Sequence, residues 1–161
     1  MKNNIFIRYA ELSDSKDIYN WEFHPSSRKW MRNKNVISFE KHQLWLKNYL
    51  KKVDSKLFIC QNKDLEKIGI VRVDKNDKTN EISIGITIDP LKRGKGFASE
   101  CLHKVIEYVS LNLWINRTFI AEIMNNNIAS LRTFEKVGFK FFGESDNFYI
   151  YKKGKNIYRN F

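Results

Sequence analysis

Cysteine is scarce in this sequence, and the spacing of the cysteines suggests neither a set of structural disulfides nor a metal site. The 161 residues include two cysteines, Cys60 and Cys101, whose separation suits neither a zinc site nor a disulfide scaffold. We therefore expect both thiols to be reduced core residues, and we expect no metal site. Reduced cysteines are typical of the cytoplasm, which is the compartment that we predict.

Long apolar runs are also missing. No stretch approaches the roughly 20 apolar residues that a membrane-spanning helix needs. The first residues, MKNNIFIRYAEL, lack the apolar core and the small-residue cleavage site of a signal peptide. We therefore expect no membrane partner.

Runs of like charge are absent, although the chain is strongly basic. The formal net charge is +11, yet no run of one sign reaches the roughly five residues typical of an interaction tail. A basic surface suits nucleic acid, acidic lipid or a phosphorylated ligand, and lysines scattered over a surface produce the same total. No recognised nucleic-acid-binding motif accompanies the charge. We expect a small-molecule substrate and no nucleic acid, and keep a nucleic-acid-binding module as an alternative.

The hydrophobic residues, 42% of the chain, are ample for a core. The length fits one domain over residues 1–161, and neither a repeat nor a linker divides it. Apolar residues alternate in some segments and recur every three or four positions in others, which predicts strands and helices respectively. Pro25 predicts an irregular segment, and Ser38 is placed to cap a helix. The expected strands are 5–10, 56–62, 66–74, 80–89, 117–124, 140–144 and 147–153, and the expected helices are 15–21, 38–52, 98–111 and 130–138.

The segment DPLKRGKGFASE joins an expected strand to an expected helix. Its glycines let the backbone come close to a ligand, and the free N–H groups at a helix start favour an anion. Three cations add Coulomb attraction, so the segment predicts a phosphate or pyrophosphate site; the alternative is a plain glycine turn with solvated lysines. A P-loop motif is absent, and a dinucleotide fingerprint requires glycine or alanine where Ser99 stands.

The same segment resembles a known cofactor loop. Arg93-Gly94-Lys95-Gly96-Phe97-Ala98 matches Arg/Gln-x-x-Gly-x-Gly/Ala, the acetyl-CoA pyrophosphate loop of the GNAT N-acetyltransferases. Downstream, AEIMNNNIASLRTFEKVGF is similar to that family's next strand, its Asn-x-x-Ser turn at Asn127 and Ser130, and its closing helix. The resemblance implies an α/β fold of the α+β type, with a mixed, mostly antiparallel sheet of about six or seven strands flanked by helices. It also implies acetyl-CoA as co-substrate and an amine as acceptor.

In that family two central parallel strands splay apart and the pantetheine arm lies between them. Here they correspond to Glu81–Ile88 and Arg117–Met124, with a bulge expected near Gly85 that frees an N–H for the thioester oxygen. The resemblance implies main-chain contacts to pantetheine from Ile86 and Ile88. It further implies that the following residues bind the cofactor: Arg93, Gly94, Lys95, Gly96, Phe97, Ala98, Asn127, Ser130 and Phe134.

Acetyl transfer to an amine requires a base, because only a neutral amine attacks. Glu122, on the second splayed strand, is the first candidate and Glu81 is the second; the alternative for each is an exposed strand carboxylate paired with a cation. Many family members carry a tyrosine acid where this chain has Phe134. A thiol pKa of about 8.5 makes the thiolate a tolerable leaving group without an acid. Water, Tyr149 or Tyr151 are the remaining proton donors.

The segment His24–Leu50 resembles one branch of the family, the acetyltransferases of pseudaminic-acid biosynthesis. Both carry His-Pro-x-x-Arg-Lys-x-Met followed by Phe-Glu-x-His. This implies a UDP-linked amino-dideoxy sugar, acetylated at its 4-amino group, as acceptor. The substrate-binding residues would be His24, Arg28, Lys29, Trp30 and Met31, with the cations meeting the phosphates.

Other acceptors remain open at this point. Ribosomal-protein N-terminal acetyltransferases share a looser version of the Trp-Met segment but depart from it at His24, and a polyamine is a further possible acceptor. A non-catalytic acetyl-CoA-binding protein is another alternative, favoured a little by Phe134. A simpler interpretation of Pro25, Trp30 and Met31 is that they fix a loop and part of the core. We expect a monomer or a homodimer.

Overall fold

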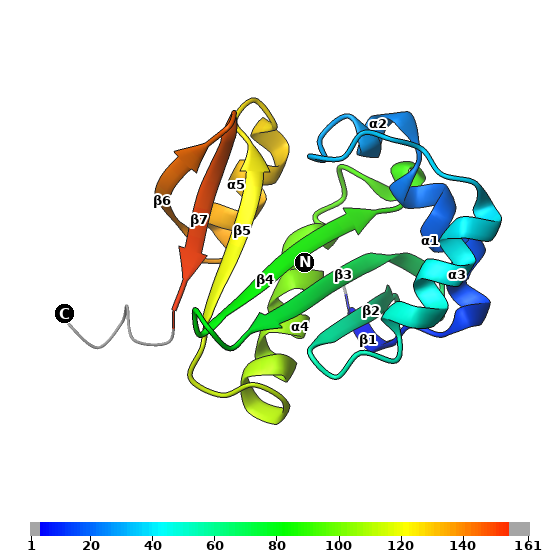
Figure 1. The fold of residues 1–161 in the computed structure, drawn as a ribbon, viewed down its shortest axis with the longest axis horizontal. Coiled ribbons are helices and arrows are strands. Elements are labelled where there is room, and N and C mark those ends of the chain that lie inside the picture. The colour runs from blue at the N-terminus through cyan, green and yellow to red at the C-terminus, as the bar shows by residue number, and fades with distance from the viewer. Residues whose placement is uncertain (1–3, 155–161) are drawn as a thin grey trace.

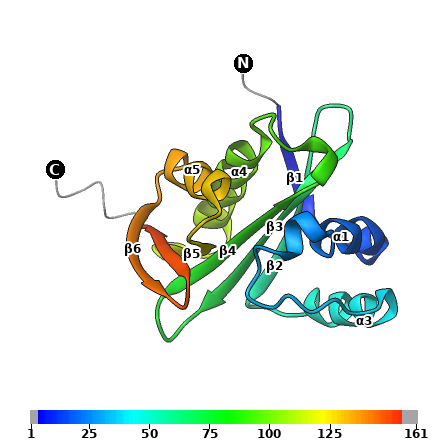
Figure 2. The same ribbon diagram turned by 90° about the horizontal axis from the view of Figure 1, so that it is seen from above.

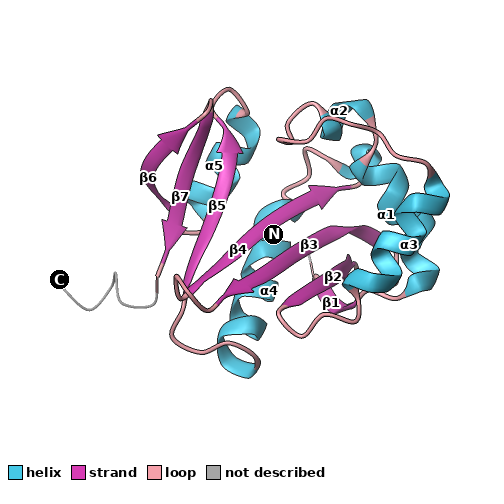
Figure 3. Ribbon diagram, viewed as in Figure 1, coloured by secondary structure: helices cyan, strands magenta, loops and turns pink. Residues whose placement is uncertain are grey.

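The computed structural model describes residues 4–154. It is built on one seven-stranded sheet in the order β1-β2-β3-β4-β5-β7-β6, with helices on both faces (Figures 1 and 3). The expected fold class is therefore confirmed. The strands are β1 (Phe6–Tyr9), β2 (Ser55–Gln61), β3 (Lys67–Asn76), β4 (Glu81–Ile88), β5 (Thr118–Met124), β6 (Lys140–Ser145) and β7 (Phe148–Lys153). The α-helices are α1 (Ser15–Glu22), α2 (Pro25–Arg28), α3 (Phe39–Tyr49), α4 (Phe97–Asn112) and α5 (Ile128–Lys136), and 3-10 turns cover Leu12–Asp14 and Pro90–Lys92.

The pairing of β4 with β5 interrupts an otherwise antiparallel sheet. These two strands are parallel, and their ladder ends at the pair Ser83–Ile120. Both strands continue beyond that point, to Ile88 and Met124, and Figure 1 shows them diverging. The expected splay of the central parallel strands is therefore present.

Different helices cover the two faces of the sheet. Figure 2 shows α4 and α5 on one face and α1 and α3 on the other. The alternation of β2 explains this arrangement, because successive side chains point to opposite faces. Phe58 and Cys60 belong to the core under α4, whereas Leu57 and Ile59 belong to the core under α1 and α3. Both faces of the strand are thus buried, and so are both cysteines.

The helix starts follow local chemistry. The Ser38 hydroxyl accepts a bond from the Lys41 N–H and caps α3, as expected. The segment at Pro25 differs from the expectation, because it forms the short helix α2 rather than irregular chain. Proline tolerates the first helical position, where its missing N–H is no loss. The His24 ring accepts a bond from the Ser26 N–H and caps this helix.

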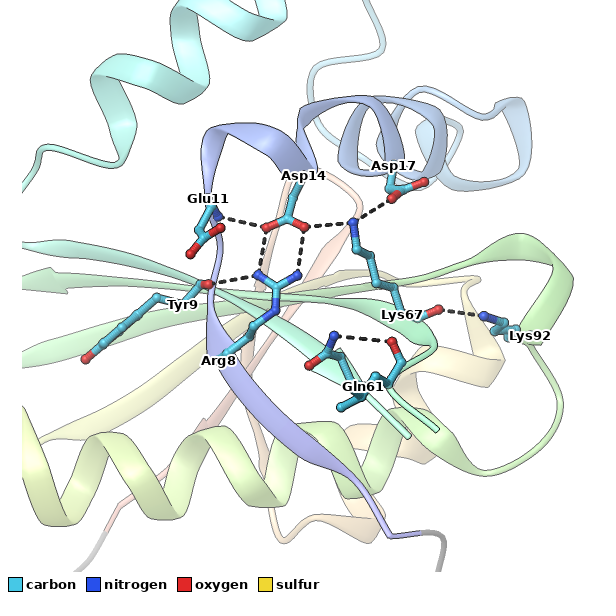
Figure 4. A network of polar contacts seen from close by, with 9 residues as sticks. Arg8, Tyr9, Glu11, Asp14, Asp17, Gln61, Lys67 and Lys92 are labelled. Carbon is cyan, nitrogen blue, oxygen red and sulfur yellow. Dashed lines mark hydrogen bonds and ion pairs between the residues drawn. The ribbon is translucent and has the colours of Figure 1, made fainter. Parts of the chain in front are cut away.

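A buried charge network joins the N-terminal strand to the segment that follows β4 (Figure 4). Asp14 is 1% exposed and lies 2.8 Å from both Arg8 and Lys67. Burial on its own raises the pKa of Asp14, but the hydrogen bonds from Arg8 and Lys67 outweigh that effect and hold it below its usual range. The Lys67 carbonyl in turn accepts a bond of 2.6 Å from Lys92. The network therefore anchors one end of the glycine-rich segment.

Among residues 4–154, no helix is both long and apolar enough to cross a membrane.

Candidate active site

A cavity of about 1170 Å³ lies where β4 and β5 separate. Its walls come from the second half of β4, the end of β5, the glycine-rich segment, the start of α4, α5, and the segment from α1 to α3, with further residues from β3 and β7. The sequence-predicted cofactor segment and acceptor segment therefore meet in one cavity, although more than half of the chain lies between some of their residues.

The main chain of β4 provides hydrogen-bonding groups to this cavity without a bulge. The register with β3 runs unbroken from Gly69–Ile88 to Asn76–Glu81, so the bulge expected near Gly85 is absent. Asp89 donates its N–H to the Ile68 carbonyl on the β3 side. Because alternate residues of an antiparallel pair point away from the partner, the main chains of Ile86 and Ile88 face β5. Because the β4–β5 ladder has already ended at Ser83–Ile120, the N–H and C=O groups of Ile86 and Ile88 are not paired with β5.

The glycine-rich loop has the backbone that a phosphate site needs. Gly94 and Gly96 have φ angles of +76° and +79°, and a Cβ built at either meets nothing within 4 Å. The glycines are therefore needed for their left-handed backbone rather than for lack of space. Gly96 directly precedes α4, so the free N–H groups of Phe97 and Ala98 point out of the helix start.

The opposite wall is formed by α5. The Asn127 side chain caps this helix by accepting a bond of 3.3 Å from the Ser130 N–H, and both residues line the cavity. Phe134 also lines it, and its ring meets that of Phe139 edge-on at 5.0 Å. Neither Tyr149 nor Tyr151 lines the cavity. The hydroxyls of these two tyrosines therefore lie outside the cavity, and water is the remaining proton donor for the leaving thiolate.

The two candidate bases are separated by the structure. Glu122 lines the cavity, and Arg32 donates a bond of 2.7 Å to its Oε2. Glu81 lies where β4 and β5 are still paired, opposite Thr118, and forms an ion pair with Lys152 at 3.0 Å. Glu81 is not part of the cavity wall. We therefore do not retain it as a candidate base.

Four of the five residues expected to bind the acceptor line the cavity, namely Arg28, Lys29, Trp30 and Met31. His24 does not. It is exposed and occupied in capping α2, with Nδ1 at 2.7 Å from the Ser26 hydroxyl. The expectation that His24 contacts the acceptor is therefore corrected to a structural role beside the cavity.

Comparison with known proteins decides the family. Residues 4–140 match the family model described as an acetyltransferase (GNAT) domain. The chain belongs to the GNAT family. Its domain is thus an N-acetyltransferase domain, and acetyl-CoA is the acetyl donor of the family.

Several proteins are distantly similar to this GNAT domain. An uncharacterized protein of Methanocaldococcus jannaschii is 27% identical over 140 residues, which are 86% of this chain. The chain spans only 28% of that relative's length. A solved domain from the same organism is similar over 95% of this chain and 99% of its own, with 24% identity and a TM-score of 0.80. The Vibrio cholerae spermidine N-acetyltransferase, solved with CoA and spermine, is similar over 92% of both chains, with 17% identity and a TM-score of 0.81.

The cavity of this GNAT domain fits acetyl-CoA. The left-handed glycine loop, the open start of α4 and the Arg93 guanidinium gather at one end, where a pyrophosphate would meet N–H donors and positive charge. The outward-facing main chains of Ile86 and Ile88 belong to the end of β4, which leads into this loop, and Glu122 lines the same cavity. Among the described residues, no group of three or more histidine, cysteine or acidic side chains is arranged to hold a metal ion.

Sequence reasoning missed a buried polar group at the acceptor end of the GNAT cavity. Glu22, 7% exposed, lies 3.2 Å from the Arg72 guanidinium. Burial raises the pKa of Glu22, against the opposing charges of Arg72 and Arg28. Burial also lowers the pKa of His42, and its Nε2 has no hydrogen-bond partner among residues 4–154. No local pattern marks these residues, because Glu22 and Arg72 are far apart in the chain; only the Phe-Glu-x-His resemblance pointed to His42.

Proposed function

We propose that this domain acetylates the amine of an acceptor that also carries an anionic group. The chemistry favoured is the 4-amino group of a UDP-linked amino-dideoxy sugar. The observation that supports this proposal most is the charge of the acceptor end of the cavity. Four cations line it, Arg28, Lys29, Arg32 and Arg72, against the two carboxylates Glu22 and Glu122.

Both carboxylates are already engaged by cations. Glu22 is paired with Arg72, and Glu122 with Arg32. Little negative charge is therefore left to attract a polycation. Arg28 and Lys29 form no ion pair among residues 4–154, and their charges can meet a diphosphate. The Arg28 Nη1 already donates to the Asn33 carbonyl at 2.7 Å, so its other N–H groups would bind the phosphates. The Arg28 Nε is buried and has no hydrogen-bond partner in the described part of the chain. Guanidinium groups bind phosphate oxygens through paired N–H donors.

The proposed reaction gives each of these groups a role. Glu122 accepts the proton that the amine loses as its nitrogen bonds to the acetyl carbon, directly or through one water. Main-chain N–H groups at the cavity-facing edge of β4 stabilise the negative charge that develops on the acetyl oxygen. The sulfur leaves as a thiolate and takes its proton from water, because the buried Phe134 has none to give.

A polyamine acceptor is the second candidate, favoured by the likeness to the Vibrio cholerae spermidine N-acetyltransferase. At that level of identity the likeness concerns the fold. The cavity opposes a polyamine on electrostatic grounds, since two like charges 4 Å apart repel by about 4 kcal/mol near a protein surface. Spermidine would bring several such charges towards Arg28 and Lys29.

An acceptor panel tests the proposal. The purified protein is given acetyl-CoA with a UDP-linked 4-amino-4,6-dideoxy sugar, spermidine, or a ribosomal-protein N-terminal peptide, and the release of free thiol is followed. We expect the sugar nucleotide to be acetylated fastest. Faster acetylation of spermidine or of the peptide would overturn the sugar assignment and leave acetyl transfer itself in place.

A further inference from the structure

Arg93 links the cofactor loop to the acceptor-side segment. Its Nη1 donates a bond of 2.7 Å to the Ser26 hydroxyl, and its Nη2 bonds to the Ser27 hydroxyl. Both serines belong to α2, whose last residue is Arg28. Two hydroxyl acceptors on the two arms of one guanidinium fix its plane and direction, which a single contact would not do.

Arg93 forms no ion pair with any residue that the structure describes. Burial lowers the pKa of Arg93, and the more distant charge of Asp89 opposes this only in part. The serines therefore hold the cation without neutralising it. Its full charge remains for an anion at the neighbouring glycine loop.

The Ser26 hydroxyl is itself held in one orientation. The Ser26 N–H points at His24 Nδ1, at 3.2 Å, so this nitrogen carries a lone pair. The Ser26 hydroxyl then donates its proton to the same nitrogen, at 2.7 Å, and keeps its own lone pairs for Arg93. Ser27 is buried. His24, Ser26 and Ser27 thus form a preorganised support for one guanidinium.

We propose that Ser26 and Ser27 are positioning residues for acetyl-CoA binding. They hold Arg93 against the pyrophosphate position, and so make donor affinity depend on the acceptor-side segment. The inference rests on the use of acetyl-CoA by this domain. It adds two residues that lie 66 and 67 positions before the arginine they hold, outside the cofactor loop.

The first test is a thermodynamic cycle on acetyl-CoA affinity measured by calorimetry. The double variant Ser26→Ala/Ser27→Ala and the single variant Arg93→Ala should each weaken binding about tenfold. Because the serines act through the arginine, the triple variant should bind no more weakly than Arg93→Ala alone. Ser83→Ala is the matched control, since Ser83 is exposed and does not line the cavity. Additive losses in the triple variant, or unchanged affinity in the double variant, would overturn the proposal.

The second test separates positioning from general damage to α2. Acetyl-pantetheine carries the reacting thioester but lacks the pyrophosphate. The double variant should lose about tenfold in kcat/KM with acetyl-CoA and nothing with acetyl-pantetheine. Equal losses with both donors would mean that the serines only support the fold. If the double variant fails to fold, Ser26→Thr and Ser26→Ala replace it, with threonine expected to restore affinity. Absence of acetyl-CoA binding by the unaltered protein would instead contradict the proposed function.

Discussion

Substitution of Gly96 by valine probes the cofactor loop most sharply. Gly96 has φ +79°, a region that costs an L-residue about 1–2 kcal/mol. A Cβ at this position meets no atom within 4 Å, so no clash adds to that conformational term. Because small domains are stable by about 5–15 kcal/mol, the variant should remain folded. Its isopropyl group, however, stands where the backbone has to approach a phosphate.

We expect Gly96→Val to weaken acetyl-CoA binding at least tenfold, or about 1.4 kcal/mol. Calorimetry gives the affinity, and a thermal melt gives the folding stability of the same preparation. Gly143→Val is the control, because Gly143 in β6 also has open space at its Cβ but lies outside the cavity. A folded Gly96→Val protein that binds acetyl-CoA as well as the unaltered protein would refute the assignment of this loop.

Three further changes test the catalytic, acceptor and structural assignments. Glu122→Gln should lower the acetylation rate by about 10²–10⁴ with little change in acetyl-CoA affinity, and the loss should shrink at high pH, where more amine is neutral; near-normal turnover at neutral pH would exclude Glu122 as the base. Arg28→Ala should raise KM for the sugar nucleotide and leave acetyl-CoA affinity unchanged; the reverse pattern would contradict the acceptor assignment. Asp14→Asn should destabilise the fold by about 3 kcal/mol in a urea titration, because it leaves Arg8 and Lys67 without their carboxylate. Folding lowers the pKa of Asp14, so its ion pairs contribute fully to the free energy of unfolding above a pH of about 3.9, and the contribution is lost as the pH falls further. An Asn variant that loses as much stability in acid as the unaltered protein would contradict this role of Asp14.

Local patterns were enough to predict most of the sheet and the glycine-rich junction between β4 and α4. Alternating apolar residues mark β2, whose two faces pack into two cores. Glycine and cations at a strand-to-helix junction mark the loop, because few other local structures need both. Ser38 is a good cap by residue type, and the structure confirms it.

The remaining features depend on contacts that no local pattern records. The bulge at Gly85 was wrong because β3 holds β4 in unbroken register, and divergence of β5 frees the N–H groups instead. His24 was assigned to the acceptor from the resemblance of the His-Pro-x-x-Arg-Lys-x-Met segment alone. Histidine is not among the preferred helix caps, so no local pattern indicated that His24 would cap α2. The pairing of Glu22 with Arg72 joins α1 to β3 and arises only in the folded chain.

The most direct measurement of the acceptor's chemistry compares one amino sugar in two forms. The same 4-amino-4,6-dideoxy sugar is offered with and without its UDP group, and kcat/KM is determined for each with acetyl-CoA saturating. If Arg28 and Lys29 bind the diphosphate, that binding energy positions the amine for attack. The account then predicts a preference of about 100-fold or more for the nucleotide-linked form. Equal kcat/KM values for the two forms would contradict an anionic acceptor.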